Sequence, residues 1–202
     1  MLIRNGAAVD YVFIGDSITQ GCELYAYFGD KAQVLINRGI GGDKSKSLRQ
    51  RFEADALQLK PRHIVLCVGI NDTWVLDDFT CEEEKLVQCI TRNVVTQVTA
   101  LAELCERQGQ SLILCSILPT NLPQHQTDRT RNLMLVQINA AIRELAGELG
   151  FVYVDYHSEL TGEDGITLRH ELAGDGIHPN VSGYDIMARI LRNTLALHDI
   201  VI

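Results

Sequence analysis

Hydrophobic residues are gathered in five short runs, and between the runs lie longer segments in which apolar positions recur with a helical period. The short runs are rich in β-branched and aliphatic residues, as buried strands are. The predicted strands are Tyr11–Ile14, Val34–Ile36, His63–Val68, Ser111–Ile117 and Phe151–Val154. The predicted helices are about Ser45–Leu59, Cys81–Gln108, Thr130–Leu149 and Val181–Leu197. Gly109 and Gly150 directly follow two of these helices, where helix C-caps belong.

Strands that alternate with helices indicate parallel βαβ units and a sheet covered on both faces. The nearly continuous apolar stretch from Ile64 to Val68 agrees with burial on both faces of such a sheet. A chain of 202 residues is most simply one domain, residues 1–202. We therefore predict an α/β protein, a three-layer α/β/α sandwich around a five-stranded parallel sheet. We expect a flavodoxin-like strand order, although periodicity alone does not determine that order.

Several residues that could take part in catalysis follow the predicted strands, at the sheet edge where ligands bind in open α/β folds. Ser17 follows the first strand, Gly42 follows the second after a short loop, and Asn71 follows the third. Asp175 and His178 lie in the long connection after the fifth strand. Serine, histidine and aspartate together turn a weak hydroxyl into an acyl-transfer nucleophile. Because all five residues fall on one edge, the sequence predicts that they form one site.

Four sequence blocks resemble the SGNH hydrolase (GDSL esterase/lipase) superfamily and occur in the order typical of that superfamily. The blocks are Gly15-Asp16-Ser17-Ile18, Asn37-Arg38-Gly39-Ile40-Gly41-Gly42-Asp43, Gly69-Ile70-Asn71-Asp72 and Asp175-Gly176-Ile177-His178-Pro179. Ile18 stands where the namesake motif has Leu, and this exchange keeps an apolar side chain. The blocks span nearly the whole chain, and the resemblance implies the SGNH hydrolase fold.

The resemblance also implies a role for each residue of the predicted site. Ser17 is the implied nucleophile, His178 the general base and Asp175 the group that orients the histidine. The implied oxyanion hole consists of the backbone N–H groups of Ser17 and Gly42 and the side-chain amide of Asn71. Physical reasoning agrees, since a histidine within hydrogen-bond reach of a serine takes its proton and later returns it to the leaving group.

Simpler interpretations of individual residues stand beside these roles. Taken alone, Ser17 is more simply a turn serine or a helix N-cap, as most serines in such positions are. His157 also follows the fifth strand and is a rival for the general base. Cys22 and Trp74 come a few residues after the predicted nucleophile and the predicted oxyanion asparagine. They are candidates for the substrate pocket, with packing in the core or at the rim as the alternative.

We expect no cofactor and no metal. The segment Gly39–Gly42 is glycine-rich enough to cradle a phosphate, and flavodoxin-like folds bind FMN, but neither GxGxxG nor a Walker lysine motif occurs. The cysteines and histidines lack the spacing of metal ligands. The formal charge of −8 argues against nucleic acid as a partner, because binding to phosphates relies on dense Lys and Arg.

The apolar runs, the N-terminal segment and the cysteines give indications of the cellular compartment. No apolar run approaches the length needed to cross a bilayer, and no apolar signal core precedes the first predicted strand. The six cysteines include no CxxC pair, and a domain of this size does not need disulfides. We therefore predict reduced thiols and a cytoplasmic location. The sequence does not indicate the oligomeric state of the protein.

The predicted function is that of a serine esterase or acylhydrolase, which cleaves a small-molecule ester through an acyl-Ser17 intermediate. The segments Val154-Asp155-Tyr156 and Asp175–Pro179 resemble the acetylhydrolase-like branch of the superfamily, and the short chain shows no large lid insertion. We therefore expect a short acyl group such as acetyl. The alternatives are a lysophospholipase or thioesterase, an acyltransferase that uses the same site, and a non-catalytic module that binds carbohydrate or lipid.

Overall fold

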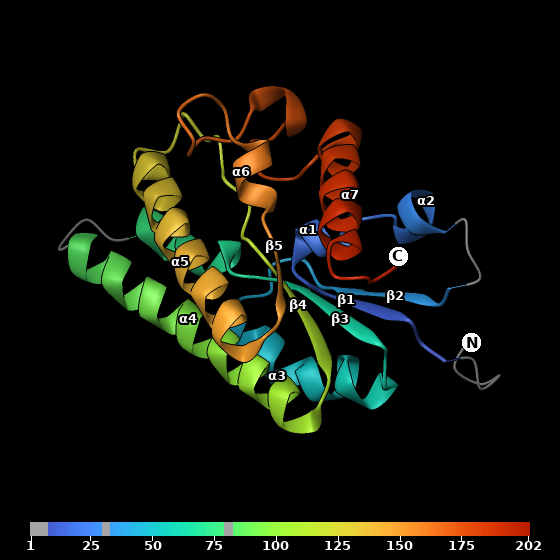
Figure 1. Ribbon diagram of the computed structural model, residues 1–202. Helices are drawn as coiled ribbons and strands as arrows, with labels where there is room; N and C mark the ends of the chain where they lie inside the picture. The colour runs from blue at the N-terminus through green and yellow to red at the C-terminus, as the bar shows by residue number, and fades with distance from the viewer. Residues whose placement is uncertain (1–7, 30–32, 79–82) are drawn as a thin grey trace.

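The computed structural model describes residues 8–29, 33–78 and 83–202, and in this part of the chain five parallel strands form a sheet between layers of helices (Figure 1). The strand order is β2-β1-β3-β4-β5, which is the flavodoxin-like order. The strands are β1 (Tyr11–Gly15), β2 (Leu35–Gly39), β3 (His63–Cys67), β4 (Ser111–Cys115) and β5 (Val152–Val154). The α/β class, the three layers and the strand order predicted from the sequence are thus confirmed.

The carboxyl ends of the first three strands lie side by side because the strands pair without an offset. Gly15, the last residue of β1, pairs with Gly39 at the end of β2 and with Cys67 at the end of β3. Every residue of β1 is buried, since neighbouring strands flank it and helices cover both faces. Whatever follows these three strands therefore meets at one edge of the sheet.

Helices cover the two faces of the sheet in two groups (Figure 1). On one face α4 packs against both α3 and α5, whereas α1, α2 and α7 lie on the opposite face and α6 packs against α7. The helices are α1 (Ser17–Gln20), α2 (Leu24–Phe28), α3 (Ser45–Asp55), α4 (Glu83–Gln108), α5 (Asp128–Leu149), α6 (Tyr156–Leu160) and α7 (Val181–Ala196). The 3-10 helices are η2 (Leu57–Leu59), η3 (Ile70–Asp77) and η4 (His170–Leu172). Within the described ranges, none of the helices is long and apolar enough to span a membrane.

The long predicted helices are confirmed, with small shifts at their ends. The segment Ser45–Leu59 divides into α3 and η2, and the predicted start of the next helix at Cys81 lies outside the described residues. Gly150 caps α5 with a φ of 70°, as expected for a C-cap. Periodicity did not predict α1, α2 and α6, because helices of four or five residues are too short to show a 3.6-residue period.

The turn from β1 into α1 contains a buried carboxyl group. Asp16 is the N-cap of α1, and its Oδ1 accepts a hydrogen bond from the Ile18 N–H at 3.0 Å. Its side chain is almost wholly removed from water, with 1% of the residue exposed. Burial raises the pKa of Asp16 to about 7, although the Ile18 hydrogen bond and the positive charge of a protonated His178 oppose that rise.

We predict that replacing Asp16 with Asn changes how stability depends on pH. In the unfolded chain an aspartate ionises near pH 4, so between about pH 4 and pH 7 the folded protein holds a proton that the unfolded chain lacks. The Asp16 contribution to stability therefore falls as pH rises through this window. Asn cannot ionise but still caps α1, so the stability of Asp16→Asn relative to the original chain should rise by up to about 4 kcal/mol from pH 4 to pH 8.

Urea unfolding of both proteins at several pH values measures this difference. Parallel stability curves for Asp16→Asn and the original chain would show that Asp16 is ionised in the folded protein throughout this range.

Candidate active site

Ser17, His178 and Asp175 form a continuous chain of hydrogen bonds at the carboxyl edge of the sheet. Ser17 is the first residue of α1, directly after the turn that ends β1, and its Oγ lies 2.8 Å from His178 Nε2. His178 Nδ1 lies 2.6 Å from Asp175 Oδ2. The structure thus brings together three residues that lie at opposite ends of the sequence.

The Asp175 carboxylate determines which ring nitrogen of His178 carries the proton. Its Oδ1 accepts hydrogen bonds from the backbone N–H groups of Ile177 at 2.9 Å and His178 at 2.8 Å. Burial raises the pKa of Asp175, but these bonds and the bond from the His178 ring outweigh it and lower the pKa to about 2. An ionised carboxylate only accepts hydrogen bonds, so the proton is on Nδ1. Nε2 is then free to accept the hydroxyl proton of Ser17.

The turn that carries Asp175 and His178 is attached to the rest of the protein through its backbone. The Gly176 carbonyl accepts a hydrogen bond from the Asn121 N–H at 2.8 Å, in the connection between β4 and α5. Directly after the turn, Asn180 caps α7 by accepting the Gly183 N–H at 3.1 Å. His178 therefore sits between two anchored points, although its side chain is 46% exposed.

The loop after β2 passes close to Ser17, since a Cβ added at Gly41 would lie 3.8 Å from the Ser17 Cβ. Gln20 Oε1 accepts the Gly41 N–H at 2.7 Å, which ties this loop to the end of α1. Gly42 has a φ of 79° and is exposed, and the space where a Cβ would stand is open. A side chain there would strain the backbone and shield the N–H, so glycine suits a backbone donor that meets a ligand.

Asn71 connects η3 to this loop. Its Nδ2 donates to the backbone carbonyl of Asp43 at 3.0 Å, immediately after Gly42. Its Oδ1 accepts the indole N–H of Trp74 at 3.0 Å. The next residue, Asp72, is buried and accepts both the N–H and the hydroxyl of Ser45 at the start of α3, at 2.8 and 2.7 Å. The asparagine predicted from the sequence is therefore held beside the glycine predicted with it.

One arginine binds the ends of two strands and the loop that follows the second of them. Arg51, on α3, donates to the carbonyl oxygens of Gly15 and Arg38, each at 2.9 Å. It also forms an ion pair with Asp43, with Nε 2.6 Å from Oδ2, and a second one with Asp55. Its side chain is 16% exposed, so these bonds are partly shielded from water.

Nothing in the sequence indicates that Arg51 and Gln20 lie at this site. Arg51 lies in the middle of a helix, and its side chain reaches two strand ends that are distant in the sequence. Gln20 is an exposed residue of a very short helix. Neither residue belongs to a block that signals catalysis, and no periodic pattern singles them out.

His157, the rival for the general base, lies in the core. It is 6% exposed, its backbone N–H donates to Ser116 Oγ at 2.8 Å, and burial lowers the pKa of its ring. The Ser17 hydroxyl instead faces His178. The geometry therefore favours His178 as the partner of the serine.

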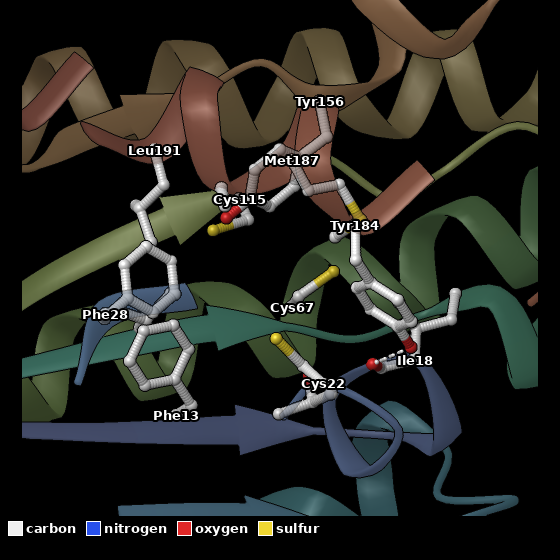
Figure 2. Close-up of a pocket in the computed structure, with 13 residues that line it drawn as sticks. Phe13, Ile18, Cys22, Phe28, Cys67, Cys115, Tyr156, Tyr184, Met187 and Leu191 are labelled. Atoms are coloured by element: carbon white, nitrogen blue, oxygen red, sulfur yellow. Dashed lines mark hydrogen bonds between the residues drawn. The ribbon is translucent and has the colours of Figure 1, made fainter. Parts of the chain in front are cut away.

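Cys22 lines a small apolar cavity behind α1, between the sheet and α7 (Figure 2). The cavity has a volume of about 30 Å³, room for one or two water molecules, and Ser17 is not part of its wall. Figure 2 shows the sulfur atoms of Cys22, Cys67 and Cys115 on the cavity side. Burial raises the pKa of the Cys22 thiol to about 11, which makes it a poor nucleophile. Its predicted place in a substrate pocket stays a prediction.

Comparisons with known proteins agree with this geometry. The GDSL-like Lipase/Acylhydrolase family matches residues 13–186, which include Ser17, Gly42, Asn71, Asp175 and His178. An acetylxylan esterase of Geobacillus stearothermophilus is 26% identical, over 93% of this chain and 94% of its own length.

Two solved structures share the fold. A GDSL-like lipase from Bacteroides thetaiotaomicron aligns with a TM-score of 0.76 at 24% identity, over 94% of this chain and 88% of its own. A catalytic serine-to-alanine mutant of an acetylxylan esterase from Geobacillus stearothermophilus aligns with a TM-score of 0.73 at 23% identity, over 94% of each chain. Family match, fold and the facing serine and histidine lead to one conclusion: the chain belongs to the GDSL-like lipase/acylhydrolase family of SGNH hydrolases and is an enzyme that cleaves ester bonds.

Proposed function

We propose that this enzyme hydrolyses esters of short carboxylic acids, acetyl esters above all, through an acyl intermediate on Ser17. The observation that carries the proposal is the hydrogen-bonded chain from Ser17 through His178 to Asp175. Around it, the N–H groups of Ser17, Gly42 and Asn71 supply the donors that an oxyanion requires. All these groups belong to one sheet and its loops, which supports the interpretation of residues 1–202 as a single hydrolase domain.

In the first half of the reaction, the Ser17 Oγ attacks the ester carbonyl carbon while His178 Nε2 takes the hydroxyl proton. The carbonyl oxygen becomes negatively charged and accepts hydrogen bonds from the backbone N–H groups of Ser17 and Gly42 and from Asn71 Nδ2. Asp175 stabilises the imidazolium that forms, because its carboxylate stays ionised at all working pH values. When the tetrahedral intermediate collapses, His178 gives the proton to the leaving alcohol.

In the second half of the reaction, water replaces the alcohol. His178 Nε2 takes a proton from the water molecule, and the resulting hydroxide attacks the acyl carbon on Ser17. The same donors bind the second oxyanion. Collapse returns the proton to Ser17 Oγ and releases the carboxylic acid.

A short acyl group is supported by the exposure of the site, by the small size of the nearby apolar cavity and by a similar protein that is an acetylxylan esterase. Side chains of His178 and Asp175 are 46% and 54% exposed, so the reacting groups lie close to the surface. The apolar cavity behind α1 is too small for a fatty acyl chain and is not lined by Ser17. A relative aligned over nearly its whole length is an acetylxylan esterase. Hydrolysis of an acetyl ester on a carbohydrate is therefore the best supported reaction.

A cytoplasmic location is part of the proposal. Five cysteines in the described ranges, Cys22, Cys67, Cys89, Cys105 and Cys115, are free thiols. Free thiols persist in reducing compartments, which supports the location predicted from the sequence.

The Ser17→Ala variant tests the nucleophile. We expect it to lose hydrolysis of p-nitrophenyl acetate by a factor of at least about 10³ and to lose covalent labelling by a fluorophosphonate probe, because no other group takes the place of the Oγ. Mass spectrometry of the labelled original chain should place the adduct on Ser17. An adduct on another residue, or equal labelling of Ser17→Ala, would refute the assignment.

The Asn71→Ala variant tests the oxyanion donor. We expect the rate of ester hydrolysis to fall about a hundredfold or more, since one oxyanion donor contributes roughly 3–4 kcal/mol to the transition state. Circular dichroism and thermal unfolding serve as controls for the fold. Unchanged kcat and kcat/KM in the folded variant would remove Asn71 from the site.

A panel of p-nitrophenyl esters tests the acyl group. We expect kcat/KM to be highest for acetate and to decline as the acyl chain lengthens, because the surface site offers a long chain little apolar contact. A preference for chains of about eight carbons or longer would contradict the proposal and favour a lysophospholipase or thioesterase. Product analysis with added alcohols separates hydrolysis from acyl transfer.

A further inference from the structure

We propose that Trp74 is a positioning residue for the oxyanion hole, because its indole N–H holds the Asn71 amide in the orientation that presents an N–H beside Gly42. This inference rests on the proposed function of Asn71 and assigns a task to a residue that touches neither Ser17 nor His178 in the contacts described. Trp74 is the only tryptophan in the sequence.

The Asn71 side chain has a limited set of hydrogen-bonding groups. An asparagine amide has one oxygen that accepts and one nitrogen with two hydrogens to donate. In this structure the oxygen accepts the Trp74 indole N–H at 3.0 Å, and one hydrogen of the nitrogen is donated to the Asp43 carbonyl, also at 3.0 Å. The second hydrogen of the nitrogen is left for a ligand.

The two protein partners select one orientation of the amide. An indole N–H only donates, and a backbone carbonyl only accepts. If the amide turned over, its nitrogen would face the indole N–H and its oxygen would face the Asp43 carbonyl, so two hydrogen bonds would be replaced by two repulsive contacts. The Trp74 indole N–H and the Asp43 carbonyl therefore both favour the same orientation of the Asn71 amide.

The position of Asp43 brings the free N–H of Asn71 close to the backbone donor. Asp43 directly follows Gly42 in the loop after β2, and Arg51 holds its carboxylate. The hydrogen bond to the Asp43 carbonyl thus attaches the amide nitrogen to the loop that carries the second proposed oxyanion donor, one residue after Gly42. An amide with its oxygen turned to this place would repel a developing oxyanion instead of stabilising it.

A buried cation fixes the indole ring in turn. The guanidinium carbon of Arg131, on α5, lies 4.5 Å from the centre of the Trp74 ring. Arg131 has no exposed surface, and its Nη2 donates to both carboxylate oxygens of Asp77 at 2.9 and 2.8 Å. Its Nε donates to Thr73 Oγ1 at 3.1 Å, and Asp128 supplies a second carboxylate. A cation over the ring face attracts the ring, so these bonds limit how far the indole can tilt.

The Trp74→Phe variant separates the indole N–H from the ring. Phenylalanine keeps an aromatic face for Arg131 but has no donor for Asn71. We expect kcat for p-nitrophenyl acetate to fall about tenfold, which corresponds to the loss of one hydrogen bond, while KM changes by less than about twofold. Both half-reactions form an oxyanion, so the loss appears in kcat whichever half limits the rate.

A double-mutant cycle distinguishes positioning from a general structural role. Asn71→Ala lacks the amide, so adding Trp74→Phe to it should change kcat by less than about twofold, whereas Trp74→Phe alone costs about tenfold. If Trp74→Phe lowers kcat by the same factor in both backgrounds, or if it leaves kcat unchanged in the original chain, the proposal is wrong. Thermal unfolding of each variant shows whether any loss comes from a fraction of unfolded protein.

The labelling experiment distinguishes this proposal from the proposed function itself. If the original chain forms no fluorophosphonate adduct on Ser17, the catalytic assignment fails and the positioning role fails with it. If Ser17 is labelled and Asn71→Ala slows both labelling and hydrolysis, but Trp74→Phe slows neither, only the role of Trp74 is refuted.

Discussion

The catalytic edge of the sheet depends on the hydrogen bonds that Arg51 makes to the ends of two strands. Its guanidinium group donates to the carbonyl oxygens of Gly15 and Arg38 and pairs with Asp43. These three partners lie at the end of β1 before Ser17, at the end of β2, and in the loop that contains Gly42, a proposed oxyanion donor. A single planar group with five N–H donors can hold all three at once, which a lysine could not do. Arg51 thus connects the strand end before Ser17, the proposed nucleophile, to the loop that contains Gly42, a proposed oxyanion donor.

The groups that are proposed to react are held in place by neighbouring residues. Asp175 orients the His178 ring, Gln20 holds Gly41 next to the proposed donor Gly42, and the Asn71 amide lies between the Asp43 carbonyl and the Trp74 indole. Donors fixed in advance need no rearrangement when negative charge develops, and this is the main way in which such sites accelerate acyl transfer. The proposed site lies close to the surface, with the side chains of His178 and Asp175 about half exposed.

Much of the fold was predictable because buried parallel strands and long amphipathic helices leave a clear pattern in the sequence. The apolar run at His63–Cys67 and the 22-residue helix Asp128–Leu149 are examples. The three residues Ser17, Asp175 and His178 were predictable as partners because parallel strands end at one edge. The short helix that begins at Ser17 was not predictable from periodicity, and neither was the role of Arg51. A side chain that bonds to backbone carbonyls of distant strands leaves no local pattern.

The sequence by itself determined the α/β class, and it predicted the sheet edge of the proposed site and the residues proposed to react, since these follow from local apolar patterns and short blocks. Only the tertiary structure decided that His178 and not His157 faces the serine, that Cys22 lines an internal cavity, and that Trp74 bonds to Asn71. The physical reason is that hydrogen bonds act over about 3 Å and are directional. Which groups come within that distance depends on how separate segments pack, and residue type and spacing do not specify it.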